Sequence, residues 1–225
     1  MYSAIVLSAG IGSRMGLGYN KMLYEIKGLP IVIHTVQKFL TDVNCGQLIL
    51  VVNPTEMDNM QQLLQKANIQ DHRIQIIGGG SERQYSVYNG LQKVNQEVVL
   101  VHDGARPFVT QSMIDECYHQ ALEGRPSIVA VPVKDTIKRV LNGQIIETPD
   151  RLEMFAVQTP QAAPTELLKQ AHDLAKQHQF LGTDEASLIE KYTTTPVNVV
   201  KGDYTNIKLT TPEDLIMAEQ LLAVE

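Results

Sequence analysis

The stretch AIVLSAGIGSRMG, residues 4–16, joins a short apolar run to a glycine-rich loop. Ala4–Leu7 is continuously apolar, as expected for a strand that is buried on both faces. Gly10, Gly12 and Gly16 follow, and glycine lets a backbone approach a ligand closely. The N–H groups of such a loop, followed by the N-terminus of a helix, favour a bound anion. The stretch therefore predicts the first strand of an α/β fold and an anion-binding loop after it.

Similar apolar runs recur along the chain, and segments with helical periodicity separate them. Ile33, Val36 and Leu40, for example, would share one helical face. This order predicts right-handed crossovers and a doubly wound, mostly parallel sheet, in which ligands bind beyond the carboxyl ends of the strands. The further strands that we expect are Leu48–Val52, Ile74–Ile77, Val98–Val101, Ile128–Val131 and a late strand at Val197–Val200.

Residues 134–158 interrupt the alternation of strands and helices. The pair Asn142–Gly143 lies between two β-prone segments and predicts a hairpin. An extended hairpin cannot bury much by itself, so we expect a protruding arm that reaches another subunit. Thr211, Pro212 and Asp214 then predict the start of a final helix. Because no linker or repeat is visible, we expect residues 1–225 to form one domain.

Composition narrows the classes of partner. The 225 residues are 44% apolar and carry a formal net charge of −6, which argues against a nucleic-acid or membrane surface. The apolar runs are too short to span a bilayer, and the N-terminus has no secretory pattern. Cys45 and Cys117 have no metal-type spacing. A cytoplasmic protein whose cysteines are reduced is therefore expected.

Three kinds of phosphate-binding loop compete for residues 8–16. The Walker A loop needs G-K-[ST], which is absent, and the dinucleotide fingerprint needs a glycine where Met15 stands. The remaining kind is the nucleotidyltransferase loop, G-x-G-x-R-M followed by a lysine, and here Arg14 and Lys21 supply the two cations. Fixed cations of this kind stabilise the negative charge that develops when a nucleophile attacks an α-phosphate and pyrophosphate leaves.

Two further clusters follow the third and fourth expected strands. The glycines at 78–80, with Ser81 and Ser86, predict a surface that reads the edge of a flat ring. Asp103, at the end of a central strand, is the expected Mg²⁺ ligand, because Mg²⁺ takes one or two carboxylates together with phosphate oxygens. Arg106 is a candidate phosphate clamp, and His102 is expected to be structural.

Taken together, these motifs resemble the family of 2-C-methyl-D-erythritol 4-phosphate cytidylyltransferases, enzymes of the non-mevalonate isoprenoid pathway. The resemblance runs almost from end to end of the chain. It rests on Lys21 and on the segments AGIGSRM (9–15), GGGSERQYSV (78–87), VHDGARPF (101–108), VKDTIKR (133–139), TPQ (159–161), GTDEAS (182–187) and NIKLTTPEDL (206–215).

The resemblance implies a Rossmann-like nucleotidyltransferase fold and transfer of CMP from CTP to the sugar-alcohol phosphate, with Mg²⁺ as the cofactor. Arg14, Lys21 and Lys208 would be catalytic. Ala9, Gly10, Gly12, Gly80, Ser81, Ser86 and Asp103 would bind CTP and its metal ion, and Arg106, Thr136, Arg151, Thr183 and Lys208 would bind the acceptor. The resemblance also implies a homodimer in which the arm carries Arg151 into the partner's site.

Departures from the family pattern leave alternatives open. Met22, Gly104 and Ser81 stand where glutamine, alanine and aspartate are common. A related ribitol-5-phosphate cytidylyltransferase would share the CTP loop, although the segments TDEAS and DTIKR favour methylerythritol phosphate. An NAD-dependent oxidoreductase and a non-catalytic nucleotide-binding regulator are the more distant alternatives. Without the resemblance, residues 183–185 predict only the start of a helix.

Overall fold

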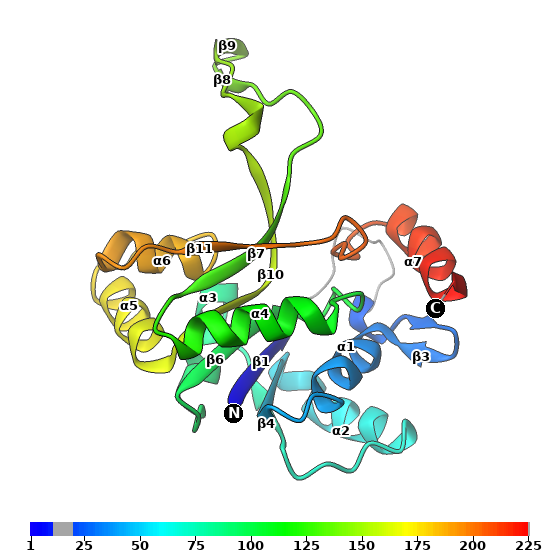
Figure 1. The fold of residues 1–225 in the computed structure, drawn as a ribbon. Coiled ribbons are helices and arrows are strands. Elements are labelled where there is room, and N and C mark those ends of the chain that lie inside the picture. Colours follow the sequence, from blue (N-terminus) through cyan, green and yellow to red (C-terminus); the bar gives the residue numbers. More distant parts are fainter. Residues whose placement is uncertain (11–19, 225) are drawn as a thin grey trace.

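The fold centres on one seven-stranded sheet (Figure 1). The computed structural model describes residues 1–10 and 20–224. The strand order is β11-β7-β10-β6-β1-β4-β5. The strands are β1 (Tyr2–Ser8), β4 (Cys45–Val52), β5 (Ile74–Gly78), β6 (Val98–Asp103), β7 (Ser127–Pro132), β10 (Phe155–Pro164) and β11 (Asn198–Lys201). Each strand expected from an apolar run is present, and β10 is an addition.

All neighbouring strands in this sheet are parallel except those that pair with β10, which runs antiparallel to both β6 and β7. The mostly parallel sheet predicted from the sequence is therefore confirmed. β10 carries Pro160 and Pro164, which argue against a central strand because proline cannot donate to the ladder. The pairing with β7 shifts its register between Val157 and Gln161, and this irregularity accommodates Pro160.

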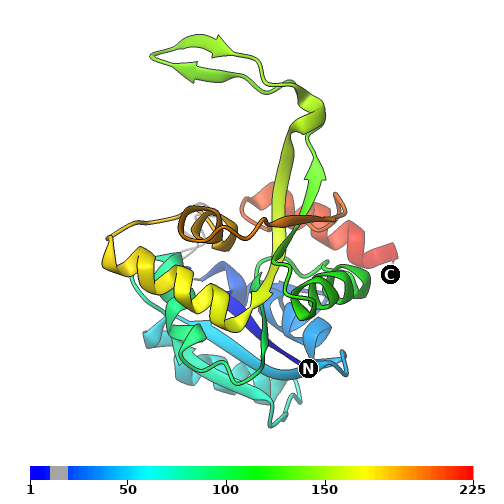
Figure 2. The same cartoon turned by 60° about the vertical axis from the view of Figure 1, so that its left-hand side comes forward.

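Helices cover both faces of the sheet (Figures 1 and 2), as a doubly wound fold requires. One apolar core joins Ala4 and Val6 of β1 to helices on one face, and a second core joins Ile5 to helices on the other face. The first set comprises α1 (Ile31–Leu40), α2 (Met57–Lys66), α4 (Gln111–Leu122) and α7 (Pro212–Val224); the second comprises α3 (Arg83–Leu91), α5 (Thr165–Gln177) and α6 (Glu185–Tyr192).

The alternation of side chains along each strand produces these two cores. Successive residues of a strand point to opposite faces, so a continuous apolar run supplies both cores at once. The register pairs Leu7 of β1 with Asp103 of β6, and Ser8 of β1 with Val52 of β4. The carboxyl ends of three central strands therefore lie together at one edge of the sheet.

The arm rises from the ends of β7 and β10 and projects away from the rest of the molecule (Figures 1 and 2). Its tip is the hairpin of β8 (Arg139–Leu141) and β9 (Gln144–Glu147). Asn142 and Gly143 have φ angles of 49° and 78°, the left-handed conformation of a tight two-residue turn. The predicted hairpin is thus confirmed. Residues 155–158 of the predicted arm already belong to β10.

Smaller features complete the fold. β2 (Glu25–Ile26) and β3 (Leu29–Pro30) form a short hairpin, and 3₁₀ turns cover Lys21–Leu23, Pro54–Glu56 and Arg151–Glu153. The Asp214 carboxylate accepts hydrogen bonds from the N–H groups of Thr210 and Thr211, which supports the expected start of α7. No helix in the described residues is both long and apolar enough to cross a membrane. Cys45 and Cys117 are buried free thiols.

Candidate active site

A cavity of about 550 Å³ opens at the carboxyl edge of the sheet. Part of its wall comes from residues just after the strands: Ala9 and Gly10 after β1, Asn53 after β4, and Gly80 after β5. The cavity brings together eight of the residues predicted from the sequence. These are Ala9, Gly10, Lys21, Gly80, Ser81, Ser86, Asp103 and Lys208.

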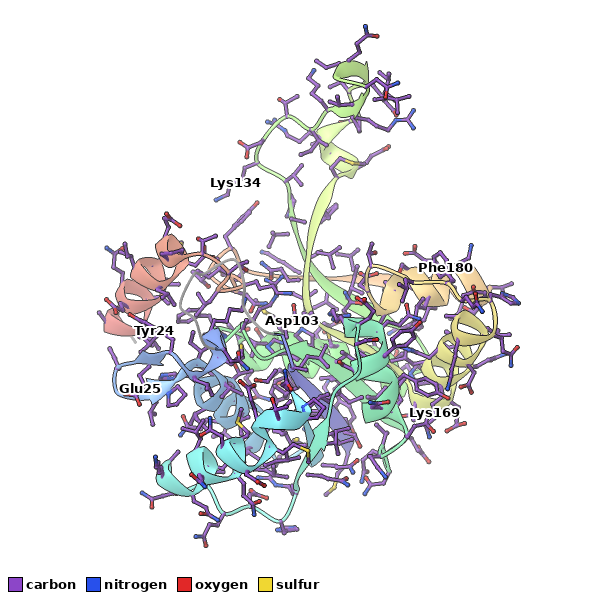
Figure 3. The ribbon with its side chains drawn as sticks, turned by 180° about the vertical axis from the view of Figure 1, so that it is seen from behind. Tyr24, Glu25, Asp103, Lys134, Lys169 and Phe180 are labelled. Carbon is purple, nitrogen blue, oxygen red and sulfur yellow. The ribbon has the colours of Figure 1, made fainter. Side chains whose placement is uncertain are left out.

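Asp103, the last residue of β6, lies near the middle of the molecule (Figure 3) and is surrounded by cations. Its Oδ2 lies 2.8 Å from Nζ of Lys208 and 3.8 Å from Nε of Arg106, and its Oδ1 lies 3.4 Å from Nε of Arg83. Burial would raise the pKa of Asp103, but the charges of Arg83, Lys208 and Arg106 outweigh it and hold the pKa well below its ordinary range. Asp103 is therefore a carboxylate at neutral pH.

Lys21 is buried in the wall of the cavity by a short 3₁₀ turn, Lys21–Leu23. Asn20 caps this turn by accepting a hydrogen bond from the N–H of Met22, and its amide group donates to Glu56 at 2.6 Å. Nζ of Lys21 donates to the carbonyl oxygen of Leu209, the residue after Lys208. Two lysines from distant segments, Lys21 and Lys208, thus lie on the same cavity.

The loop after β5 presents backbone and hydroxyl groups to the cavity. The N–H of Gly80 donates to Oγ of Ser86, which in turn donates to the carbonyl oxygen of Glu82. A side chain at Gly80 would bring its Cβ to 2.5 Å from Cβ of Tyr85, so glycine is required there. The turn is built without side-chain bulk, as expected where a flat ring is to lie against the backbone.

Several predicted residues lie away from the cavity wall. Arg106 is mostly buried beside Asp103 and donates to the carbonyl oxygen of Asn206 at 2.7 Å. Thr183 is exposed just before α6, and Thr136 and Arg151 are exposed on the arm. Arg14 and Gly12 lie outside the described residues. The expected helix start is present, since Asp184 caps α6 in a capping box with Ser187.

His102 has the structural role expected for it. It is fully buried, with Nε2 at 3.0 Å from the carbonyl oxygen of Arg106 and Nδ1 at 3.0 Å from Oγ1 of Thr159. Burial lowers the pKa of His102 to about 4, so the ring is neutral at pH 7. It supports the segment that follows β6, and it does not line the cavity.

The role of Arg83 and Glu185 was not predicted from the sequence. Nη1 and Nη2 of Arg83 lie 2.8 Å and 3.1 Å from the two carboxylate oxygens of Glu185, which is buried. Burial would lower the pKa of Arg83, but Glu185 and Asp103 raise it, so the guanidinium stays charged. The two residues are 102 positions apart. Arg83 stands in a motif that points to chemistry, but no local pattern links it to Glu185.

The comparisons with known proteins agree with this geometry. Residues 2–224 match the family model of 2-C-methyl-D-erythritol 4-phosphate cytidylyltransferase. The chain belongs to this family. It is a nucleotidyltransferase of the cytidylyltransferase class.

Curated relatives with that name share the whole length of the chain. The protein of Bacillus velezensis is 49% identical over 100% of this chain and 97% of its own, and that of Bacillus cytotoxicus is 50% identical over 100% and 99%. Among solved structures, the 4-diphosphocytidyl-2C-methyl-D-erythritol synthase of Anaerococcus prevotii superposes with a TM-score of 0.88 at 30% identity, covering 99% of this chain and 96% of its own. The resemblance predicted from the motifs is confirmed.

Proposed function

We propose that the enzyme transfers CMP from CTP to 2-C-methyl-D-erythritol 4-phosphate, releasing pyrophosphate and 4-diphosphocytidyl-2-C-methyl-D-erythritol. The observation that carries the proposal is the cavity itself. It combines two lysines and a carboxylate with the turn at Gly80–Ser86, which begins at the last of three consecutive glycines. The lysines and the carboxylate, with its metal ion, suit a triphosphate, and the turn suits a nucleotide base. The acceptor is that of the named relatives, 2-C-methyl-D-erythritol 4-phosphate.

The reaction is a substitution at the α-phosphorus of CTP. A phosphate oxygen of the acceptor forms a bond to this phosphorus, and the bond from the phosphorus to the bridging oxygen of the β-phosphate breaks. Negative charge grows on the leaving pyrophosphate and on the equatorial oxygens. Lys21 and Lys208 would stabilise that charge, together with Arg14. No covalent intermediate on the enzyme is needed, because positioning and electrostatics supply the catalysis.

Mg²⁺ fits the residues of the cavity. No group of three or more His, Cys, Asp or Glu that could hold a metal ion is present among the described residues. Mg²⁺ at phosphate sites, however, needs only one or two carboxylates and takes its other ligands from phosphate and water. Asp103 is ionised and faces the cavity, so it would hold the ion. When bound, the ion would supply positive charge against the phosphate oxygens.

The two ends of the substrates would be bound by different parts of the molecule. Gly80, Ser81 and Ser86 would bind cytosine, while Ala9, Gly10 and Gly12 would contact the phosphates. The acceptor would be bound by Lys208, with Thr183 and Arg106 nearby. Thr136 and Arg151 would reach it from the arm of a second subunit. The enzyme would then be a homodimer in which each site contains residues of both subunits.

Two features support the arm as a dimer contact. It projects from the sheet (Figure 2), so within one chain its tip packs on no other element of the described structure. Its apolar side chains are also exposed, and Leu152 is 84% accessible. Exposed apolar patches on a soluble domain mark interaction sites. The other exposed apolar side chains of the arm tip are Ile137, Val140, Leu141, Ile145 and Ile146.

We also propose that the enzyme is a single domain that works in the cytoplasm. The two buried free cysteines suit a reducing compartment. The seven strands of the central sheet come from all parts of the sequence, from β1 to β11, which supports one domain.

The test is a turnover assay on the purified enzyme with CTP, Mg²⁺ and either 2-C-methyl-D-erythritol 4-phosphate or ribitol 5-phosphate. Pyrophosphate release and the mass of the nucleotide product are measured. We expect a cytidine diphosphate-linked product from the methylerythritol substrate, and slower turnover of the ribitol substrate. A higher kcat/KM for ribitol 5-phosphate would contradict the proposed acceptor and leave the cytidylyl transfer standing.

A further inference from the structure

Arg83 joins three segments that meet at the cavity. It is the first residue of α3, its guanidinium is paired with Glu185 at the start of α6, and its Nε lies 3.4 Å from Oδ1 of Asp103 at the end of β6. The side chain of Glu185 is 3% exposed, and that of Asp103 is 10% exposed. The carboxylates are therefore largely shielded from solvent, where charge pairs interact more strongly than at the surface. Arg83 itself lines the cavity, and its side chain is 31% exposed.

The position of Arg83 is unfavourable for the helix that carries it. The N-terminus of a helix has partial positive charge, so a cation in the first turn is destabilising. Glu82 at the N-cap makes no side-chain capping bond, and α3 has no acidic residue in its first turn. Helix stability thus does not explain why an arginine occupies the first position of α3. Its contacts with the two carboxylates do explain it.

The two oxygens of Asp103 have different partners. Among the described residues, Lys208 and Arg106 contact Oδ2, and Arg83 contacts Oδ1. A carboxylate that is contacted from one side only can rotate about its Cβ–Cγ bond. With cations on both oxygens, the plane of the carboxylate is fixed.

Glu185 in turn fixes Arg83. Both carboxylate oxygens of Glu185 accept from the guanidinium, a bidentate arrangement that fixes direction as well as distance. The start of α6 is itself held by Gln161 of β10, whose side chain donates to Asp184 and accepts from the N–H of Ala186. Arg83 is thus anchored on a rigid part of the sheet.

We propose that Arg83 is a positioning residue, which fixes the orientation of the Asp103 carboxylate for the transfer reaction and is itself held by Glu185. This inference rests on the proposed function, in which Asp103 binds the metal ion. Arg83 does not need to touch the substrates. Its effect is exerted through Asp103, and a displacement of about 1 Å at a reacting centre can cost about a hundredfold in rate.

A neutral pair separates positioning from a simple structural salt bridge. Arg83→Gln alone would leave Glu185 as a buried unpaired charge and could impair folding. The double variant Arg83→Gln/Glu185→Gln removes both charges, and its folding is checked by thermal unfolding. The matched control is Arg125→Gln/Glu123→Gln, which removes an exposed Arg–Glu pair on the surface.

Two quantities are measured for the wild type, the double variant and the control. They are kcat with saturating substrates, and the Mg²⁺ concentration that gives half-maximal CTP binding in calorimetry without acceptor. For the double variant we expect kcat to fall by about a hundredfold. The half-maximal Mg²⁺ concentration should rise by about tenfold, because the two substitutions leave the net charge unchanged but no longer hold the Asp103 carboxylate in the orientation that binds the ion. Arg83→Lys keeps the charge but not the planar fork, so its kcat should fall by about tenfold.

A folded double variant with either wild-type kcat or wild-type Mg²⁺ dependence of CTP binding overturns the proposal. The binding measurement needs no acceptor. If the wild-type enzyme binds CTP but transfers nothing to 2-C-methyl-D-erythritol 4-phosphate, the proposed function fails, and the Mg²⁺ curves of the two proteins still test Arg83.

Discussion

Nζ of Lys21 donates a 2.7 Å hydrogen bond to the carbonyl oxygen of Leu209, a residue 188 positions later in the chain. This contact ties the turn at Lys21–Leu23 to the segment that carries Lys208. Both lysines line the cavity, and Lys208 is paired with Asp103. Positive charge from the two ends of the chain is therefore directed to one place, beside the end of β6.

The first prediction concerns Lys21→Ala. If Lys21 stabilises the charge that develops on the phosphates, the variant should lose about 10²–10³-fold in kcat, whereas the dissociation constant for CTP should change by less than about fivefold. Steady-state kinetics and calorimetry provide the two values. Lys66→Ala, at an exposed position on α2, is the matched control and should behave as the wild type. A weaker affinity for CTP with an unchanged kcat would show that Lys21 only binds the nucleotide.

The second prediction concerns Gly104, which follows Asp103. A Cβ at this position would lie 2.8 Å from Cε of Met22 and 2.9 Å from the carbonyl oxygen of Leu7. Two departures from the family pattern, Met22 and Gly104, therefore contact each other and form one packing unit. We expect Gly104→Ala to reduce the free energy of unfolding by about 1–3 kcal/mol, because the core has no room for the methyl group.

A double-mutant cycle with Met22→Ala tests the coupling between the two positions. Removing the methionine side chain opens space for the added methyl group, so the two substitutions should be non-additive by about 1 kcal/mol in urea unfolding. Strictly additive effects would mean that the carbonyl oxygen of Leu7 alone opposes the alanine.

The third prediction concerns His172 of α5. It is 1% exposed, and neither ring nitrogen has a hydrogen-bond partner in the described part of the chain. Burial, together with a smaller effect of the charge of Arg83, lowers the pKa of His172 to about 4. The folded state thus holds the ring neutral, whereas the unfolded chain takes up a proton below pH 6.5. Stability must therefore be lost as the pH falls from about 6.5 to about 4.

The substitution His172→Leu should remove this pH-dependent loss of stability. Between pH 7.5 and pH 5, the free energy of unfolding of the wild type should fall by about 2 kcal/mol more than that of the variant. Chemical denaturation at the two pH values measures the difference. His172→Gln is the control: it should abolish the same pH dependence but should be less stable than His172→Leu, because it buries an unpaired amide. Parallel pH profiles for wild type and His172→Leu would contradict the expected pKa.

The strands and the helix starts could be predicted from the sequence because their causes are local. A buried parallel strand needs a continuous apolar run, and each such run is a strand in the structure. The Asn142–Gly143 turn is equally local, since both residues tolerate positive φ. β10 could not be predicted in this way. Its segment TPQAAP contains two prolines, and the pairing with β6 and β7 that stabilises it is not encoded locally.

The cavity was predictable for a related reason, since the fold brings the carboxyl ends of parallel strands to one edge. Asp103 and Ser86 could be named because each follows a strand or a glycine turn. The pair of Arg83 and Glu185 could not, because it depends on how α3 and α6 meet. Thr136 and Arg151 are a third case. They lie on the arm and are exposed, and neither lines the cavity of its own chain.

The last prediction tests whether Arg151 acts in the partner's site. Lys21→Ala inactivates the site of its own chain, and Arg151→Ala removes the arm residue that would serve the other chain. In a mixed dimer, the chain with Arg151→Ala keeps its own Lys21 and receives an intact Arg151 from its partner. One of the two sites of that dimer is then complete. Random pairing gives half mixed dimers, so about a quarter of the wild-type activity should return.

The two variants are unfolded together, refolded as a mixture and assayed for pyrophosphate release, with each variant refolded alone as the control. If activity returns in the mixture but not in either variant refolded alone, the sites must be shared between chains. If Arg151 acts within its own chain, each chain in a mixed dimer carries one defect and the mixture stays as inactive as its components. Substituting Leu152 by Asp in both chains should abolish the recovery, because a charge on the exposed apolar face of the arm would oppose dimer formation.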